Sequence, residues 1–330
     1  MAHAQSVTID RTYLKHLTLN IYPDVDLKAL YTHAREALTQ HTNTCVDLPL
    51  IQGDRYYGLY DLLAGNRTCC TLQFDPLIAT NAPFRLAIKP CVGGTDAHRL
   101  IRHVLMEIFG LEYELHMNTA KIAGYELATD ISGTTLDDLL LYDSTKRVSI
   151  RHYDEHGRIS RIDLGATTSE QQIAITNKSV AEPAHVLIKQ NATAVSNGVE
   201  IVVKVRAGNT PIHNVASMAN PLASLSLIRL PRTFHGSGSA AWQGFLDSCR
   251  FRGMQAALPR LPKPELRTRF RNRVAERMVV NWWHPSVIWS GFPTMVNEIG
   301  FPKNSPTAEV DIPHNVTKQE RHHIEEDDEE

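Results

Sequence analysis

The chain has 330 residues, of which 42% are hydrophobic and 21% charged, and its formal net charge is -2 at pH 7. This length and apolar content can fill ordinary cores, which excludes a fibrous or generally disordered chain. The apolar runs are too short to cross a bilayer and the N-terminus lacks the pattern of a secretory signal, so we expect a cytoplasmic protein. The five cysteines form no CxxC pair, and the sixteen histidines form neither an HExxH motif nor a zinc quartet with cysteine. We therefore expect reduced thiols and structural histidines.

The N-terminal part of the chain, residues 1–82, predicts an α+β segment. Its apolar patterns indicate a helix at residues 26–39 and strands at residues 16–22, 56–60 and 69–74. After Pro83 the pattern sharpens into a strand, a helix and a second strand, at residues 84–89, 95–109 and 121–130. This order predicts a β-α-β unit.

Residues 83–232 predict a sheet domain. Gly133 and the two threonines after it predict the start of a helix that runs through Tyr142. Further strands are expected at residues 147–153, 159–164, 172–176 and 198–206, the first two as a hairpin. The last of these alternates an apolar face with a mostly charged one. The fold class predicted is α+β, a mainly antiparallel sheet with helices on one face and a helical C-terminal region; duplication of one unit is an alternative.

The segment from Arg229 to Arg277 carries eleven basic residues against three acidic ones, a local charge of +8. It follows a glycine-serine linker and belongs to a helical region expected at residues 240–302. Within that region Pro264 predicts the start of a helix, whose apolar row consists of Leu266, Phe270, Val274 and Met278. Because arginine offers forked donors to phosphate oxygens, the segment predicts contact with nucleic acid. The candidate DNA-binding residues are Arg250, Arg252, Arg260, Arg267, Arg269, Arg271, Arg273 and Arg277. The alternative is a solvated helix whose arginines pair with acidic residues elsewhere.

Residues 303–330 predict a disordered acidic tail, with seven acids and one arginine between Glu320 and Glu330. It is either a solubilising end or a phosphate mimic that screens the basic segment.

Acidic side chains also lie on the predicted sheet, where Glu126 and Asp130 share one strand and Glu200 lies on another. Opposed strands could bring Asp130 and Glu200 close enough to hold Mg²⁺ or Mn²⁺, which prefer oxygen ligands. Acids on a solvent-facing strand are also ordinary. A nicking reaction would need a hydroxyl nucleophile, and Tyr153, near the hairpin turn, is the best exposed candidate. No histidine-hydrophobic-histidine triplet is present, which disfavours a nickase of the HUH type.

The order of elements and several short motifs resemble plasmid and filamentous-phage replication initiation proteins of the Rep_trans type, which start rolling-circle replication. The matching segments are YELATDISGTTLDDLL, LGATTSEQQIAITNKSVAE, VEIVVKVR and NPLASLSLIRL, between residues 125 and 230. GMQAALPRLP and WWHPSVIW further on resemble the helical C-terminal end of such initiators, so the resemblance spans roughly residues 80 to 300. The resemblance implies roles for Asp130, the turn at residues 165–169, the pattern at residues 177–182, and Glu200 with Arg206. It departs at Thr176, where the family pattern usually has a tyrosine.

These features lead to a hypothesis of a replication initiator that binds origin DNA and nicks one strand through a tyrosine. Asp130 and Glu200 would hold the metal, Lys178 and Arg206 would stabilise the phosphate, and Tyr153 would attack. Host replication proteins would be further partners. The alternatives are a non-catalytic nucleic-acid-binding protein, which Thr176 favours, and a structural or virion-associated protein.

Overall fold

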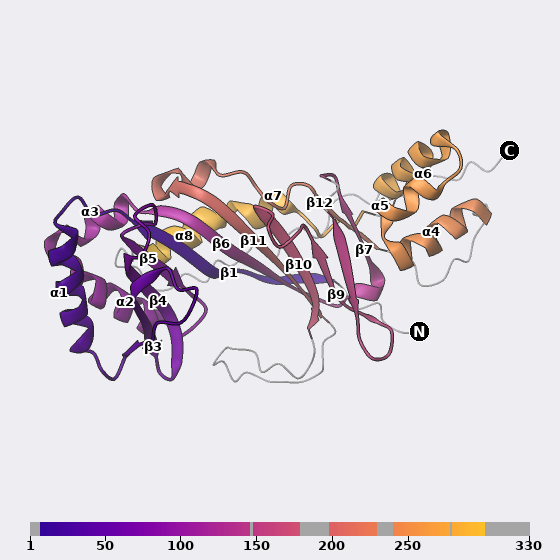
Figure 1. Cartoon of the computed structure of the whole chain (residues 1–330). Helices are drawn as coiled ribbons and strands as arrows, with labels where there is room; N and C mark the ends of the chain where they lie inside the picture. The colour runs from indigo at the N-terminus through magenta and orange to yellow at the C-terminus, as the bar shows by residue number, and fades with distance from the viewer. Residues whose placement is uncertain (1–6, 146–147, 179–197, 230–239, 278, 301–330) are drawn as a thin grey trace, which may run out of the picture.

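The computed structural model describes residues 7–145, 148–178, 198–229, 240–277 and 279–300. It is an α+β fold built on one ten-stranded antiparallel sheet with the strand order β2-β3-β4-β5-β1-β6-β11-β10-β9-β8 (Figure 1). The strands are β1 (Thr8–Ile21), β2 (Cys45–Asp47), β3 (Tyr56–Ala64), β4 (Arg67–Pro76), β5 (Phe84–Ile88), β6 (Lys121–Ser132), β8 (Ser149–Tyr153), β9 (Ile159–Leu164), β10 (Gln171–Lys178) and β11 (Gly198–Pro211).

The long first strand joins the two parts of the chain that the sequence divides at residues 82 and 83. β1 pairs with β5 on one side and with β6 on the other, so both parts share a single sheet. The predicted β-α-β unit is present as β5, α2 (Gly94–Phe109) and β6, with β1 inserted between its two strands. Insertion of a strand in this way makes it a split unit.

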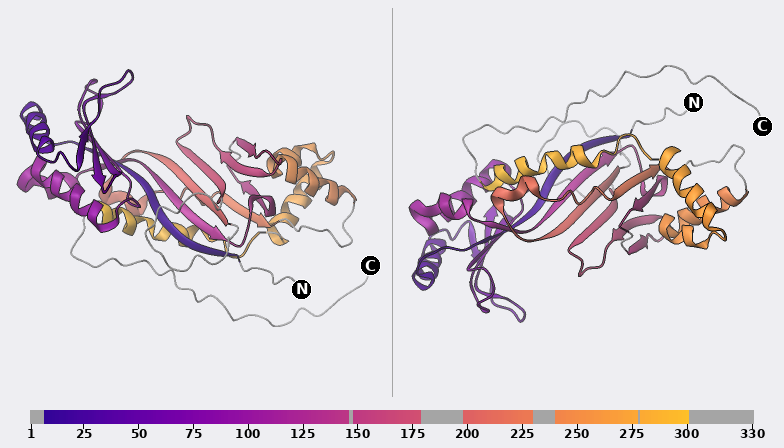
Figure 2. Two further views of the ribbon diagram at one scale, coloured as in Figure 1. Left: turned by 90° about the horizontal axis from the view of Figure 1, so that it is seen from below. Right: turned by 90° about the horizontal axis from the view of Figure 1, so that it is seen from above.

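Helices cover one face of this sheet, as the sequence predicts. At the N-terminal end, α1 (Leu27–Thr39) and α2 lie against β3, β4 and β5, followed by α3 (Tyr113–Asn118). Further along, α7 (Pro285–Ser290) and α8 (Phe292–Gly300) run along β1, β6 and β11 (Figure 2). Phe292 of α8 packs on Tyr125 of β6 with 4.4 Å between ring centroids. Asp26 starts α1, since its side chain accepts a hydrogen bond from the Lys28 amide at 3.0 Å.

A second, two-stranded sheet pairs β7 (Leu139–Asp143) with β12 (Leu225–Arg229). The predicted helix through Tyr142 is therefore wrong: only a short 3-10 turn, Leu136–Asp138, precedes the strand. An extended backbone lets neighbouring leucines point in opposite directions. Leu139 and Leu141 pack into the main core, while Leu140 packs into a separate helical cluster.

That helical cluster consists of α4 (Ala240–Arg252), α5 (Met254–Ala257) and α6 (Pro264–Arg277), and it lies at the end of the molecule opposite α1 (Figure 1). α6 begins at Pro264 as the sequence predicts. Phe270 and Val274 form its buried row, with Leu266 partly buried beside them. The fourth predicted member, Met278, lies outside the described residues.

The predicted hairpin is confirmed as β8 and β9, and the alternation on β11 is also confirmed, with its odd-numbered residues from Val199 to Val203 buried. The glycine-serine linker and the acidic tail lie outside the described residues. Within the described part of the chain, no helix combines the length and apolarity needed to span a membrane.

Candidate functional site

A row of directly opposed residues crosses six strands on the sheet face that the helices leave uncovered, here called the polar face. From β1 to β8 the row consists of Arg11, Asp130, Glu200, Thr176, Arg161 and His152. Directly opposed side chains on one face are near neighbours, about 5 Å apart at Cβ. The register therefore brings the two predicted carboxylates, Asp130 and Glu200, side by side.

Cationic side chains hold both members of this carboxylate pair. Asp130 is only 2% exposed at its side chain, and its Oδ2 accepts from Arg11 Nε at 2.7 Å and from Lys178 Nζ at 2.5 Å. Glu200 accepts from Lys15 Nζ, which lies 3.2 Å from each of its oxygens. Three cations thus face two carboxylates, leaving a surplus positive charge.

A tyrosine completes the group. The Tyr13 hydroxyl donates to Glu200 Oε1 at 2.8 Å, and the Arg11 guanidinium lies 4.4 Å from the centre of the Tyr13 ring. Burial, together with the charge of Asp130 and the hydrogen bond to Glu200, raises the pKa of the Tyr13 phenol well above its ordinary value. Burial lowers the pKa of Arg11, but the hydrogen bond and charge of Asp130 outweigh it and raise that pKa overall. The free site therefore holds a neutral phenol beside a carboxylate.

The expected Mg²⁺ or Mn²⁺ does not fit this arrangement. Of the four oxygens of the carboxylate pair, three accept hydrogen bonds from arginine, lysine or tyrosine. Asp130 Oδ1 is buried and has no hydrogen-bond partner among the described residues, which leaves one oxygen for an ion that needs several. Glu126 adds no ligand, because it pairs with Lys204 at 3.1 Å and lies four residues from Asp130 along β6.

Two of the three predicted catalytic residues lie away from the carboxylate pair. Tyr153 is on β8, three strands beyond β11, and its neighbour His152 occupies the row on the polar face, so Tyr153 points to the other face. Its hydroxyl lies 3.5 Å from the carbonyl of Phe251 in α4. Arg206 lies six residues from Glu200 along β11, about 20 Å away at the rise of a strand. Lys178 is the predicted residue that the structure brings to Asp130.

Thr176 lies directly opposite Glu200, on the side of the carboxylate away from Asp130. The resemblance to replication initiators implies a tyrosine at this position. In this chain the tyrosine hydroxyl that reaches Glu200 comes from β1 instead, through Tyr13. Of the other positions implied by the resemblance, Asn177 joins β9 to the turn before β7 through its side-chain amide, while Glu182 lies outside the described residues.

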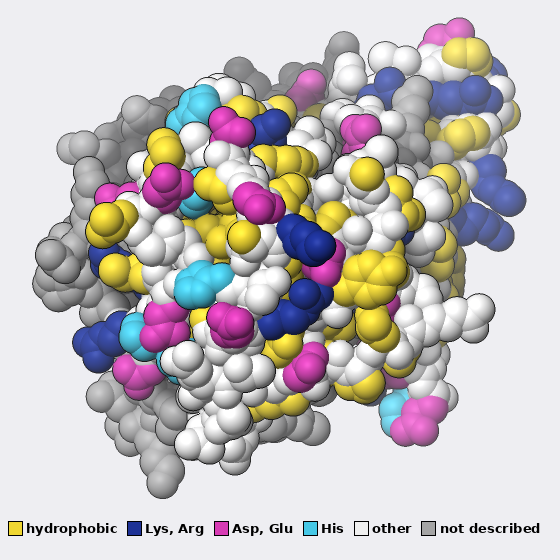
Figure 3. Space-filling view, turned by 60° about the vertical axis from the view of Figure 1, so that its left-hand side comes forward, with side chains coloured by type: hydrophobic (Ala, Val, Ile, Leu, Met, Phe, Trp, Pro, Cys, Tyr) yellow, Lys and Arg dark blue, Asp and Glu magenta, His cyan; other side chains and the backbone are white. Residues whose placement is uncertain are grey.

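The predicted DNA-binding arginines belong to the helical cluster, and basic side chains gather at that far end of the molecule, at the upper right of Figure 3. Four of them are exposed, namely Arg252, Arg260, Arg269 and Arg271. Two serve the cluster itself: Arg267 donates to the carbonyl of Leu261 at 3.0 Å, and Arg273 lies over the Trp242 ring at 4.7 Å. Arg250 pairs with Asp247 at 3.2 Å, and the side chain of Arg277 lies outside the described residues.

Sequence reasoning misses Arg11, Tyr13 and Lys15 because it begins the first strand at residue 16, whereas β1 begins at Thr8. The signal that was present is the alternation of Arg11, Tyr13 and Lys15 with smaller or apolar residues. The partners of these side chains could not be inferred, since Tyr13 and Glu200 are 187 residues apart.

No protein-family model matches the chain, and no curated protein is significantly similar to it in sequence. The resemblance to rolling-circle initiators therefore stays a prediction.

Proposed function

We propose that this chain is a replication initiator of the rolling-circle type, which binds DNA on the polar face of its sheet and nicks one strand with Tyr13 as the nucleophile. The observation that carries the proposal is the hydrogen bond from the Tyr13 hydroxyl to Glu200, with three cationic side chains around it. A hydroxyl, a base within hydrogen-bond reach and cations for a phosphate are the parts that nucleophilic attack on a phosphodiester requires.

In the proposed reaction, Tyr13 Oη attacks the phosphorus and its proton passes to Glu200. The new Tyr–O–P bond replaces the bond from phosphorus to one deoxyribose oxygen, and that oxygen leaves as a hydroxyl after taking a proton from a lysine ammonium or from water. Because the pKa of Tyr13 is raised, the phenol is not ionised in advance and needs Glu200 as base.

The cations would act on the phosphate as its charge develops. Lys178 reaches Asp130 from β10, Lys15 reaches Glu200 from β1, and Arg11 stacks on the Tyr13 ring. Arg206, further along the same face, and the exposed arginines of the helical cluster would contact the DNA backbone away from the reacting phosphate. The proposal routes no step through a metal, since the carboxylate pair already binds cationic side chains.

The test uses the full chain and supercoiled plasmid carrying the non-coding DNA next to its gene, with and without EDTA. The wild type and Tyr153→Phe should both nick the plasmid and form a covalent protein–DNA adduct that survives denaturing electrophoresis. Tyr13→Phe should form no adduct while it still binds DNA. An adduct of undiminished yield in Tyr13→Phe would refute the assignment, and loss of nicking with EDTA would restore the metal expectation.

The second candidate is a non-catalytic nucleic-acid-binding protein, which the threonine at position 176 and the ion pairs that already hold both carboxylates favour. It predicts no nicking in any variant, with DNA affinity that falls steeply as salt rises. Binding insensitive to salt and to arginine substitution would instead favour a structural protein.

A further inference from the structure

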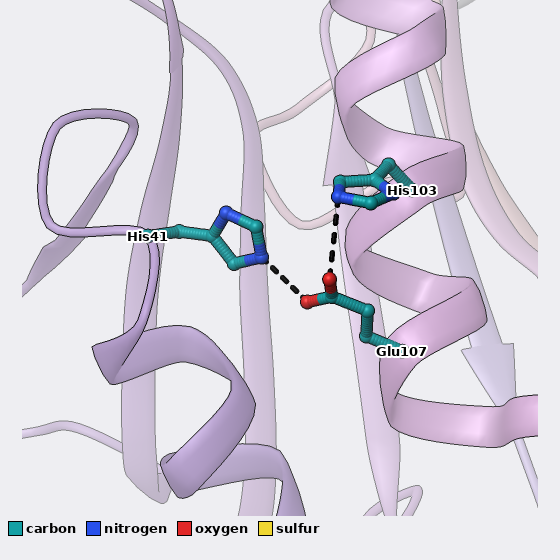
Figure 4. A group of neighbouring side chains, drawn as sticks. All are labelled: His41, His103 and Glu107. Carbon is teal, nitrogen blue, oxygen red and sulfur yellow. Dashed lines mark hydrogen bonds and ion pairs between the residues drawn. The ribbon is translucent and has the colours of Figure 1, made fainter.

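Two histidines and a glutamate converge where the end of α1 meets α2 (Figure 4). His41 lies in the turn after α1, while His103 and Glu107 lie one turn apart on α2. His41 Nε2 is 2.5 Å from Glu107 Oε2, and His103 Nε2 is 3.2 Å from Glu107 Oε1. All the potential ligand atoms lie within 4.8 Å of one another. The carboxylate therefore faces one imidazole with each of its oxygens.

We propose that His41, His103 and Glu107 form a binding site for a divalent transition-metal ion of the zinc class. Two imidazole nitrogens and one carboxylate oxygen are a donor set that zinc accepts with three protein ligands, at about 2.0 to 2.2 Å each. Ligand atoms of such a tetrahedral ion are about 3.4 Å apart. The two nitrogen–oxygen separations, 2.5 and 3.2 Å, are shorter than this value, and every ligand atom lies within 4.8 Å of the others, so side-chain rotations can open the cluster to admit the ion.

The chemistry of the donors decides which ions fit. Mg²⁺ and Ca²⁺ prefer oxygen ligands, whereas imidazole suits zinc, copper, nickel and iron. The imidazole of His103 is 63% exposed and that of His41 is 19% exposed, so the site opens to solvent on the α2 side. Water can therefore supply the remaining ligand, and ions have access.

A bound ion would act as a clip between two elements. α1 packs on the core through Ala34, Ala37 and Leu38, and the side chain of its His33 lies 2.9 Å from the backbone carbonyl of Glu107. A metal held by His41 and by both α2 ligands would fasten the C-terminal end of α1 to α2 and stabilise that end of the fold, since an ion that binds only the folded state raises its stability. The site shares no residue with the carboxylate pair, so this inference is independent of the proposed function.

The test measures zinc binding to the full, EDTA-treated chain at pH 7.5 by calorimetry. Residues 320–330 include two histidines and seven acids, which are further potential zinc ligands, so variants are compared with the wild type. His152→Gln is the matched control, because His152 is a half-exposed imidazole that pairs with one carboxylate, Asp163, at 2.8 Å. Wild type and His152→Gln should bind one more equivalent of zinc than His41→Gln, His103→Gln and Glu107→Gln. Equal stoichiometry and affinity in all five proteins would overturn the proposal.

A measurement on the wild type guards against variants that fail to fold. Zinc should slow hydrogen exchange of backbone amides in α1 and α2, over residues 27–41 and 94–109. Slowing confined to other parts of the chain, or none at all, would also overturn the proposal.

Discussion

Asp130 and Glu200 lie directly opposite each other on β6 and β11, yet each carboxylate is held by different cations. Arg11 and Lys178 bind Asp130, while Lys15 and Tyr13 bind Glu200. Two adjacent carboxylates would repel each other without these partners. The carboxylate pair thus depends on side chains from β1 and β10, so the proposed chemistry of the polar face and the stability of the sheet rest on the same contacts.

Asp130→Ala should lower the free energy of unfolding by about 2 kcal/mol, because the buried carboxylate makes two hydrogen bonds to charged partners. Urea unfolding measures the change. Glu126→Ala, on the same strand, is the control: its pair with Lys204 is more exposed and should contribute less than about 1 kcal/mol. Equal losses in the two variants would contradict the structural importance assigned to Asp130.

The stability of the chain should fall as the pH drops below about 6.5, in part through His98 on α2. Burial lowers the pKa of His98, and its Nε2 has no hydrogen-bond partner among the described residues. At pH values above the pKa of His98 in the unfolded chain, this imidazole is neutral in both states. Below that pKa the unfolded chain takes up a proton that the folded chain does not, so the free energy of unfolding falls. Urea midpoints at pH 7.5, 6.0 and 5.0 should decline less in His98→Gln than in the wild type. Parallel declines would exclude His98 as a cause.

Phe270→Ala should loosen the helical cluster and leave the large sheet folded. The Phe270 ring lies 4.9 Å from Trp242 and 5.2 Å from Phe245, centroid to centroid, and is 3% exposed. Truncation of such a ring costs about 3 to 5 kcal/mol. Hydrogen exchange should accelerate in α4 and α6 but not in β6 or β11. Phe251→Ala is the control, since that ring is 74% exposed and its loss should change little.

Reversing the charge of Arg269 and Arg271 together should weaken DNA binding and flatten its salt dependence. Both side chains are exposed on α6. If each contacts one phosphate, loss of both reduces the slope of log K against log salt by roughly 2 for duplex DNA. Fluorescence anisotropy over a salt series measures this slope. Arg99→Glu, an exposed arginine on α2 at the other end of the molecule, should leave the slope unchanged.

Much of the fold could be predicted from local patterns. Alternation on β11 and the strong start of α6 at Pro264 were sufficient to assign those elements, because burial on one face imposes a period on the sequence. The run Leu139–Asp143 misled the prediction, because a short apolar segment suits either a helix or a strand. Its leucines serve two separate cores, which only the packing reveals.

By itself, the sequence determined the α+β class and the polar face of β11, and it indicated Asp130, Glu200 and Lys178 as candidate site residues. The tertiary structure alone decided which tyrosine meets them. Register across β1, β6 and β11 brings Tyr13 to Glu200, and the alternation of side chains along β8 turns Tyr153 to the opposite face. The same holds for His41 and His103, which lie on separate segments until α1 packs on α2. Contacts between distant segments depend on strand order and helix packing, and local periodicity carries no information about either.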